Sequence, residues 1–131
     1  MAGERILIVE DNEKNRRLVR DVLQFKGYET IESETAEEGI RLAQESHPVL
    51  ILMDIQLPGI NGIEALGRLR ADARTRDIPV IAVTASAMTH DRQKILAAGF
   101  DGYQPKPINV KEFLEAVRLM LERRAGAGGA S

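Results

Sequence analysis

Two alternating hydrophobic patterns predict an α/β fold with a doubly wound, five-stranded parallel sheet and five helices. Short aliphatic runs rich in β-branched residues alternate with segments whose apolar residues recur at helical spacing. The runs are apolar on both faces, as strands are when helices cover both sides of a parallel sheet. Helices that join parallel strands form right-handed crossovers, which completes the expected topology.

Five short segments predict the strands in chain order. Residues 5–10 (RILIVE), 49–53 and 79–84 (PVIAVT) are aliphatic and β-branched, and a fifth strand is expected within residues 101–107 (DGYQPKP). Residues 28–33 (YETIES) are polar enough for an edge strand, where one side of the strand has no neighbour.

Five segments between and after the strands have the apolar spacing of amphipathic helices. Their apolar positions are Leu18, Val22 and Phe25; Ala36, Ile40 and Ala43; Ile63, Leu66 and Leu69; Ile95 and Leu96; and Val110, Phe113, Leu114, Val117 and Leu121. Residues suited to begin a helix as N-caps are Asn12, Thr35 and Asn109, and glycines suited to end one are Gly27 and Gly99.

The chain length and its last residues predict one domain and a short tail. A chain of 131 residues has the length of a single domain, assigned here to residues 1–124. Residues 125–131 (AGAGGAS) carry only small side chains and are expected to be disordered.

Composition excludes several classes of function. The formal net charge is -2 and no block of basic residues occurs, so neither nucleic acid nor a membrane surface is an expected partner. Cysteine is absent, which excludes disulfides, thiol nucleophiles and thiolate metal sites. No segment resembles a signal peptide or a membrane span, so a cytoplasmic protein is expected.

Polar residues at the carboxyl ends of the predicted strands form the candidate site. Glu10 and Asp11 end the first strand, Asp54 follows the third, Thr84 ends the fourth, and Lys106 follows the fifth. In doubly wound sheets these strand ends meet where ligands bind. Clustered carboxylates without His or Cys favour Mg²⁺, and a cation, a lysine and a hydroxyl around one carboxylate suit a phosphoryl group.

Asp54 ends the aliphatic run VLILMD, and a turn, LPG, begins three residues later. Taken alone, an aspartate at a strand end is more often a helix cap or a surface charge. The acids, hydroxyl and ammonium expected beside it favour a nucleophile instead. Pro58 and Gly59 would turn the chain beside this acid, and Gly62 would permit a conformation or a close approach that a larger residue resists.

The motifs VED (residues 9–11), LMDIQLPGINGIE (52–64), VTA (83–85) and KP (106–107) occur together in this order. With them the chain resembles the receiver domain of two-component response regulators from about residue 5 to residue 124. The stand-alone regulators of phosphorelays and cell-cycle control are most similar. The resemblance implies a (βα)5 flavodoxin-like fold.

The resemblance implies that Asp54 accepts a phosphoryl group from a histidine kinase or a histidine phosphotransfer protein. Asp11 and Asp54 would bind Mg²⁺, for which Mn²⁺ could substitute, together with the backbone carbonyl of Gln56, and Glu10 would act through water.

The resemblance also implies a conformational switch. Lys106 and Thr84 would bind phosphoryl oxygens with the backbone N–H of Ala85, and Tyr103 would turn to fill the space that Thr84 leaves. A downstream protein would read this change on the fourth helix, fifth strand and fifth helix. The bond before Pro107 would be cis.

Surface roles implied by the resemblance concern the first and last helices. Asn15, Arg16 and Leu18 are expected kinase contacts. A homodimer through the last helix is a further expectation, to which Phe113, Val117, Met120 and Leu121 could contribute, although the same side chains suit the core.

Two other functions remain open. A haloacid-dehalogenase-like phosphohydrolase also uses an aspartyl phosphate, but it needs an acid two residues after the nucleophile, where this chain has Gln56. We therefore expect a signalling domain that is no turnover enzyme. A receiver cut from a longer hybrid kinase or regulator is the other alternative, although Met1 and the short tail favour a stand-alone protein.

Overall fold

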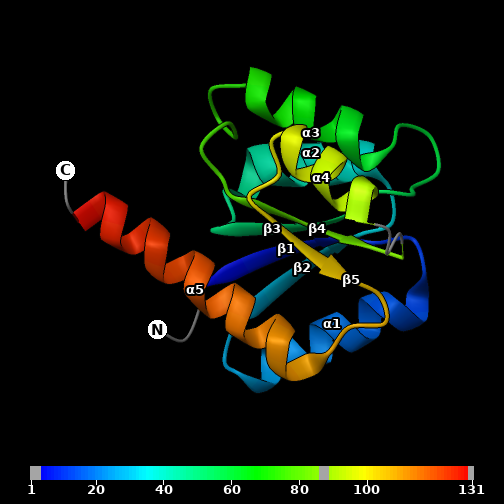
Figure 1. Ribbon diagram of the computed structural model, residues 1–131. Coiled ribbons are helices and arrows are strands. Elements are labelled where there is room, and N and C mark those ends of the chain that lie inside the picture. Colours follow the sequence, from blue (N-terminus) through cyan, green and yellow to red (C-terminus); the bar gives the residue numbers. More distant parts are fainter. Residues whose placement is uncertain (1–3, 86–88, 130–131) are drawn as a thin grey trace.

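The computed structural model describes residues 4–85 and 89–129, with only the backbone described for residues 89–91 and 124–129. Five parallel strands form one sheet in the order β2-β1-β3-β4-β5. Strands and helices alternate along the chain, and helices cover both faces of the sheet (Figure 1). The predicted doubly wound α/β fold is therefore confirmed.

The strands are β1 (Arg5–Val9), β2 (Glu29–Ser33), β3 (Leu50–Asp54), β4 (Val80–Thr84) and β5 (Gly102–Pro105). The helices are α1 (Glu13–Phe25), α2 (Ala36–Ser46), α3 (Gly62–Ala71), α4 (Thr89–Ala97) and α5 (Val110–Gly129). The polar strand β2 lies at one edge of the sheet, as its sequence predicts. No helix in the described ranges is long and apolar enough to cross a membrane.

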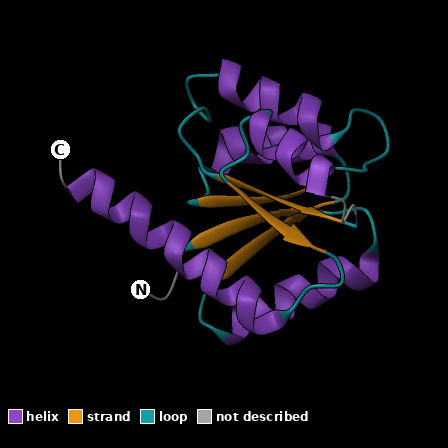
Figure 2. Ribbon diagram, in the orientation of Figure 1, coloured by secondary structure: helices purple, strands orange, loops and turns teal. Residues whose placement is uncertain are grey.

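Alternate residues of each inner strand pack into two separate cores. Leu7 and Val9 of β1 face α2, α3 and α4, while Ile6 and Ile8 face α1 and α5. Figure 2 shows these helices in two layers with the sheet between them. Because β1, β3 and β4 are covered on both faces, their apolar runs are continuous.

The helix ends follow the predicted capping residues. The side-chain oxygen of Asn12 accepts a hydrogen bond from the backbone N–H of Asn15, that of Thr35 from Glu38 N–H, and that of Asn109 from Glu112 N–H. Gly27 and Gly99, after α1 and α4, have positive φ values of 91° and 113°. Both adopt a backbone conformation that costs glycine little.

The buried face of helix α1 differs from the one predicted from the sequence. Val19 and Leu23 form its buried face, whereas Leu18 is 41% and Phe25 is 85% exposed. Two overlapping apolar stripes run along this helix, and hydrophobic period alone does not determine which of them meets the sheet.

Helix α5 differs from the sequence-based expectation at the C-terminus. It continues to Gly129, five residues beyond the expected domain end at residue 124, so residues 125–129 are helical rather than disordered. Extending an existing helix needs no new nucleus, so these residues continue α5 without the cost of starting a helix. Residues 130–131 lie outside the described range.

Candidate functional site

The carboxyl ends of β1, β3 and β5 bring four charged side chains together. Glu10 and Asp11 follow β1, Asp54 is the last residue of β3, and Lys106 follows β5. One carboxylate oxygen from each of the three acids lies within 4.8 Å of the others. We call these four residues the acid site.

Lys106 holds two of the acids directly. Its Nζ lies 2.6 Å from Glu10 Oε1 and donates a hydrogen bond of 2.9 Å to Asp54 Oδ2. All three side chains are largely withdrawn from solvent, with 16% of Lys106, 5% of Glu10 and 6% of Asp54 exposed. The lysine therefore bridges the ends of β1 and β3 from a position after β5.

Burial and charge change the acidity of this group. Burial raises the pKa of Glu10 to about 7, although hydrogen bonds from Lys106 and the Asn12 N–H oppose the rise. Burial also lowers the pKa of Lys106, but the hydrogen bonds and charges of Asp54 and Glu10 outweigh it and the net pKa is raised. The site thus holds more negative charge than its one ammonium group neutralises.

The loop after β3 fixes the direction of Asp54. The backbone N–H of Gln56 donates a 3.1 Å hydrogen bond to Asp54 Oδ1, which leaves Oδ2 to Lys106. Gly62 starts α3 directly against this loop, and a Cβ there would lie 2.5 Å from the backbone oxygen of Asp54. Glycine is required because the helix approaches the strand end so closely.

The carboxylate oxygens of the acid site suit a magnesium ion. Clustered carboxylate oxygens are hard ligands. Among the described residues, the group at this site consists of carboxylates and includes no thiolate or imidazole. Burial, with a smaller contribution from the charge of Asp54, raises the pKa of Glu10, and a bound cation would favour its ionised form. Glu10, Asp11 and Asp54 are therefore able to hold the ion.

Residues assigned to the switch lie around the same rim. Thr84 ends β4 fully buried, and its backbone oxygen accepts a 2.8 Å hydrogen bond from the Lys106 N–H. Ala85 follows it and is exposed. Tyr103, on β5, is partly buried against the core, with the Arg92 guanidinium 5.8 Å from its ring centroid. The Lys106–Pro107 peptide bond is cis.

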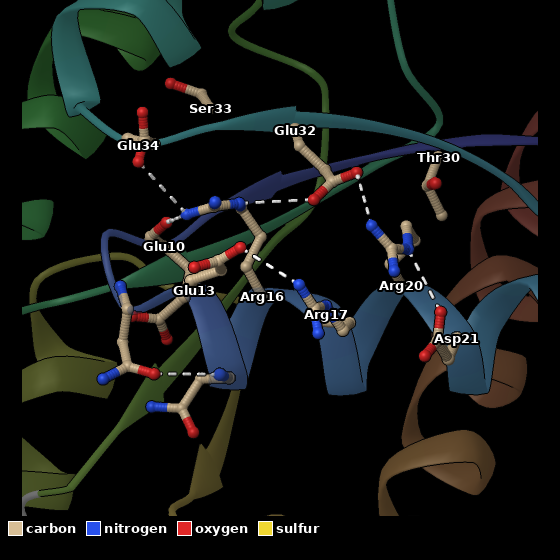
Figure 3. Close-up of polar contacts among 12 residues, drawn as sticks. Glu10, Glu13, Arg16, Arg17, Arg20, Asp21, Thr30, Glu32, Ser33 and Glu34 are labelled. Atoms are coloured by element: carbon tan, nitrogen blue, oxygen red, sulfur yellow. Dashed lines mark hydrogen bonds and ion pairs between the residues drawn. The ribbon is translucent and has the colours of Figure 1, made fainter.

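The three expected kinase contacts have different surroundings on α1. Leu18 is 41% exposed. Asn15 is partly exposed, and its backbone N–H donates to the side-chain oxygen of Asn12, the N-cap of the helix. Only 15% of the Arg16 side chain is exposed, because it lies against Glu10, Glu32 and Glu34 (Figure 3).

The apolar residues of α5 have different degrees of exposure. Phe113 and Val117 are fully buried in the core beside α1, whereas Met120 and Leu121 are partly buried at its margin. Phe113 and Val117 therefore contribute to the core of the chain itself, which leaves Met120 and Leu121 for any contact with a second copy.

Two features of the site were not predicted from the sequence. One is the direct pairing of Lys106 with Glu10, which links residues 96 positions apart and leaves no local pattern. The other is the inward position of Arg16, whose spacing along α1 is equally compatible with solvent. A surplus of acids near one lysine was the only signal available for the first.

Comparisons with known proteins extend over nearly the whole chain. Residues 6–118 match the family model described as the response regulator receiver domain. The polar-differentiation response regulator DivK of Brucella ovis is 48% identical over 116 residues, covering 88% of this chain and 94% of that protein. DivK of Brucella anthropi is 47% identical over the same shares.

Solved structures agree with these sequence matches. The receiver domain of the sensor histidine kinase PA1611 from Pseudomonas aeruginosa, described with a magnesium ion coordinated in its active site cleft, has a TM-score of 0.85 and 33% identity. That match covers 92% of this chain and 99% of the other. A CheY-like receiver domain protein from Methanospirillum hungatei has a TM-score of 0.87 and 31% identity, covering 96% and 99%.

Proposed function

The chain belongs to the response regulator receiver family of two-component signalling, and from this we propose that Asp54 is its phosphoryl acceptor. One observation carries the proposal. The Asp54 carboxylate lies at the end of β3 with Lys106 on one oxygen and two further carboxylates within reach. Such an arrangement presents a nucleophile beside groups that can stabilise a phosphoryl group.

In the proposed reaction, an oxygen of Asp54 attacks the phosphorus of a phosphohistidine on a kinase or a phosphotransfer protein. The new O–P bond forms as the N–P bond breaks, and the electron pair of that bond returns to the imidazole. The product is an aspartyl phosphate and a free histidine. Lys106, already 2.9 Å from Asp54 Oδ2, is placed to bind a phosphoryl oxygen in place of the carboxylate.

The proposed metal ligands are Asp11, Asp54 and the backbone carbonyl of Gln56, with Glu10 acting through water. Bound there, Mg²⁺ would offset negative charge on the phosphoryl oxygens and the carboxylates, and Mn²⁺ is proposed as a substitute. The magnesium described in the PA1611 receiver domain supports this assignment by analogy.

The proposed switch involves Thr84 and Tyr103, as the resemblance to the receiver family implies. The Thr84 hydroxyl and the Ala85 N–H would bind the phosphoryl group, and Tyr103 would turn inward as Thr84 moves. A downstream protein would then recognise the surface of α4, β5 and α5. In the structure Tyr103 lies between the core and Arg92, so its side chain has one buried and one exposed side.

Helix α1 is the proposed docking surface for the phosphoryl donor, in the cytoplasm. It begins beside the acid site, and Leu18 offers exposed apolar area one turn further along. Asn15 is a second proposed contact. Arg16 is the least available of the expected contacts because internal partners already occupy its guanidinium.

We propose a signalling role rather than turnover of a substrate. The stored phosphoryl group is the signal, and its loss by hydrolysis resets the domain. The match to DivK, a stand-alone regulator covered over 94% of its length, favours a stand-alone relay protein over a piece of a hybrid kinase. No described residue supplies the second acid of a dehalogenase-type hydrolase two positions after Asp54, because Gln56 stands there.

Intact mass spectrometry tests the proposal. The protein is incubated with acetyl phosphate with and without Mg²⁺, alongside Asp54→Asn and the surface control Asp72→Asn. We expect one added phosphoryl group in wild type and Asp72→Asn, only with Mg²⁺, and none in Asp54→Asn. Equal labelling of Asp54→Asn would assign the acceptor elsewhere, and no labelling of wild type would overturn the proposal.

A further inference from the structure

Arg16 is almost buried at the start of α1 and binds three parts of the chain. Its Nη1 donates a 2.9 Å hydrogen bond to the backbone oxygen of Glu10, and its Nε lies 3.3 Å from Glu32 Oε1. Nη1 also lies 3.7 Å from Glu34 Oε1. Figure 3 shows the guanidinium between the loop after β1 and the end of β2.

The carbonyl that Arg16 holds belongs to the peptide unit between Glu10 and Asp11. A peptide unit is planar, so a bond to its oxygen restricts the orientation of both flanking residues. The other side of Glu10 is also tied, since its N–H donates a 3.0 Å hydrogen bond to the backbone oxygen of Ser33. Only residues 10–12 lie between β1 and α1, which leaves little slack in this loop.

The two glutamates keep Arg16 in place. Glu32, on β2, also lies 3.8 Å from Arg20 Nη1, so it is shared between two arginines one turn apart on α1. Arg16 and Arg20 together carry two positive charges, which compensate the charges of Glu32 and Glu34. Arg17, the next residue, makes a different contact, a 3.0 Å ion pair with Glu13 on the exposed side of the same helix.

We propose that Arg16 is a positioning residue that holds the Glu10–Asp11 peptide in the orientation needed to bind Mg²⁺. This inference rests on the proposed function of the acid site. It assigns Arg16 an internal role in place of the kinase contact expected from the sequence. Groups that orient metal ligands from outside the coordination shell commonly contribute about 10- to 100-fold to metal affinity.

Charge alone predicts the opposite effect, which makes the inference easy to test. Arg16 is a cation near a cation site, so removing its charge without disturbing the loop should strengthen Mg²⁺ binding. Removing a group that anchors the loop should instead weaken Mg²⁺ binding. The sign of the change in the dissociation constant therefore separates the two roles.

Calorimetric titration of Mg²⁺ into Arg16→Met, Arg16→Lys and the charge-matched control Arg17→Met tests this role. We expect the dissociation constant to rise about tenfold in Arg16→Met, to rise less in Arg16→Lys, and to stay near wild type or fall slightly in Arg17→Met. Lysine keeps the charge but lacks the planar fork that reaches the Glu10 carbonyl and Glu32 together.

Two further measurements exclude a merely structural role. Urea unfolding without Mg²⁺ gives the stability of each variant, and amide hydrogen exchange at Asp11 and Asn12 reports the order of the loop. A structural role alone would lower stability and leave Mg²⁺ affinity of the folded protein unchanged, which would overturn the inference. If Arg16→Met does not fold, Arg16→Lys alone still tests the role, because it keeps the charge and weaker Mg²⁺ binding in that variant cannot come from charge.

Mg²⁺ binding and phosphorylation of the wild-type protein distinguish a failure of this inference from a failure of the proposed function. If wild type binds Mg²⁺ and accepts phosphate from acetyl phosphate while Arg16→Met binds Mg²⁺ equally well or better, only the inference fails. If wild type binds no Mg²⁺ and accepts no phosphate, both fail.

Discussion

Two groups of charged residues lie at opposite ends of the sheet and differ in how their charge is balanced. At the acid site, three carboxylates lie close together, and one ammonium group pairs with two of them. At the other end, Arg70 Nη2 donates a 2.8 Å hydrogen bond to Asp101 Oδ2, and its Nη1 donates to the backbone oxygens of Arg76 and Ile78. We call Arg70 and Asp101 the arginine clasp.

The clasp is balanced because its one cation meets one anion. Asp101 Oδ2 also accepts a 2.8 Å hydrogen bond from the fully buried N–H of Val80, so the pair satisfies the backbone as well as itself. The acid site is more deeply buried yet holds surplus negative charge. A balanced, partly exposed pair such as Arg70 and Asp101 is explained by structure alone, whereas a surplus of one sign in a buried site indicates that a ligand of opposite charge binds.

Replacing the cation of each group by methionine should give the largest difference in phosphorylation rate. Lys106→Met is expected to slow phosphorylation by acetyl phosphate about 100-fold or more, because a donor aimed at the phosphoryl group is lost. Arg70→Met should leave the rate of the folded protein near wild type and lower only its stability. Time courses of intact mass measure the rates, and equal slowing in both variants would remove the functional distinction between the two groups.

The surplus charge should also appear as a pH dependence of stability. Burial raises the pKa of Glu10 from its ordinary value of 4.5 to about 7 in the folded chain, which therefore holds this proton more tightly than the unfolded chain does. Its contribution to stability is present below about pH 4.5 and is lost as the pH rises to about 7, by up to about 3 kcal/mol.

Urea unfolding in EDTA from pH 4.5 to 8 measures this loss. The quantity compared is the free energy of unfolding of wild type minus that of Glu10→Gln at each pH. Asp72 provides a control whose contribution should be constant over this pH range. Hydrogen bonds from Arg74 lower the pKa of Asp72 from 3.8 to about 2, so its contribution is lost only as the pH falls through that range. A difference curve for Glu10 that rises with pH would contradict the assigned direction.

Removing an acid should affect the two ends of the sheet oppositely. Asp101→Ala is expected to lower the free energy of unfolding by about 1–3 kcal/mol, because the buried Val80 N–H loses its acceptor. Asp54→Asn should leave stability in EDTA unchanged or slightly raised, because Lys106 keeps Glu10 and one repelling charge is gone. Urea unfolding of both variants tests this, and a loss in Asp54→Asn as large as in Asp101→Ala would contradict it.

Helix α3 connects the two groups, since it begins at Gly62 beside Asp54 and carries Arg70 near its end. Gly62→Ala should cost about 1–3 kcal/mol of stability because its Cβ would meet the Asp54 backbone at 2.5 Å. Gly67→Ala, with nothing within 4 Å of the added Cβ, should instead stabilise by about 0.5–1 kcal/mol. Thermal unfolding compares the two, and equal effects would contradict the close approach.

Much of the acid site could be located from the sequence because it depends on strand ends. Asp54 and Lys106 each occur next to a recognisable strand, and parallel strands place their carboxyl ends at one edge. The turn after Asp54 and the glycine at position 62 were also readable. These features rest on residue type and order alone.

Other features depend on which elements become neighbours. The period of α1 allowed either apolar stripe to be buried, and the position of the sheet selects Val19 and Leu23 over Leu18 and Phe25. The end of α5 depends on a balance between helix propensity and chain entropy that composition alone did not resolve.

The sequence by itself determined the alternating elements, the parallel sheet and the residues at its carboxyl end, because hydrophobic period and chain order are local properties. The tertiary structure alone decided that Lys106 bridges Glu10 and Asp54 and that Arg16 turns inward to the Glu10 carbonyl. Those contacts depend on distances between segments far apart in the chain, and on burial that sets the pKa of Glu10, neither of which a local pattern encodes.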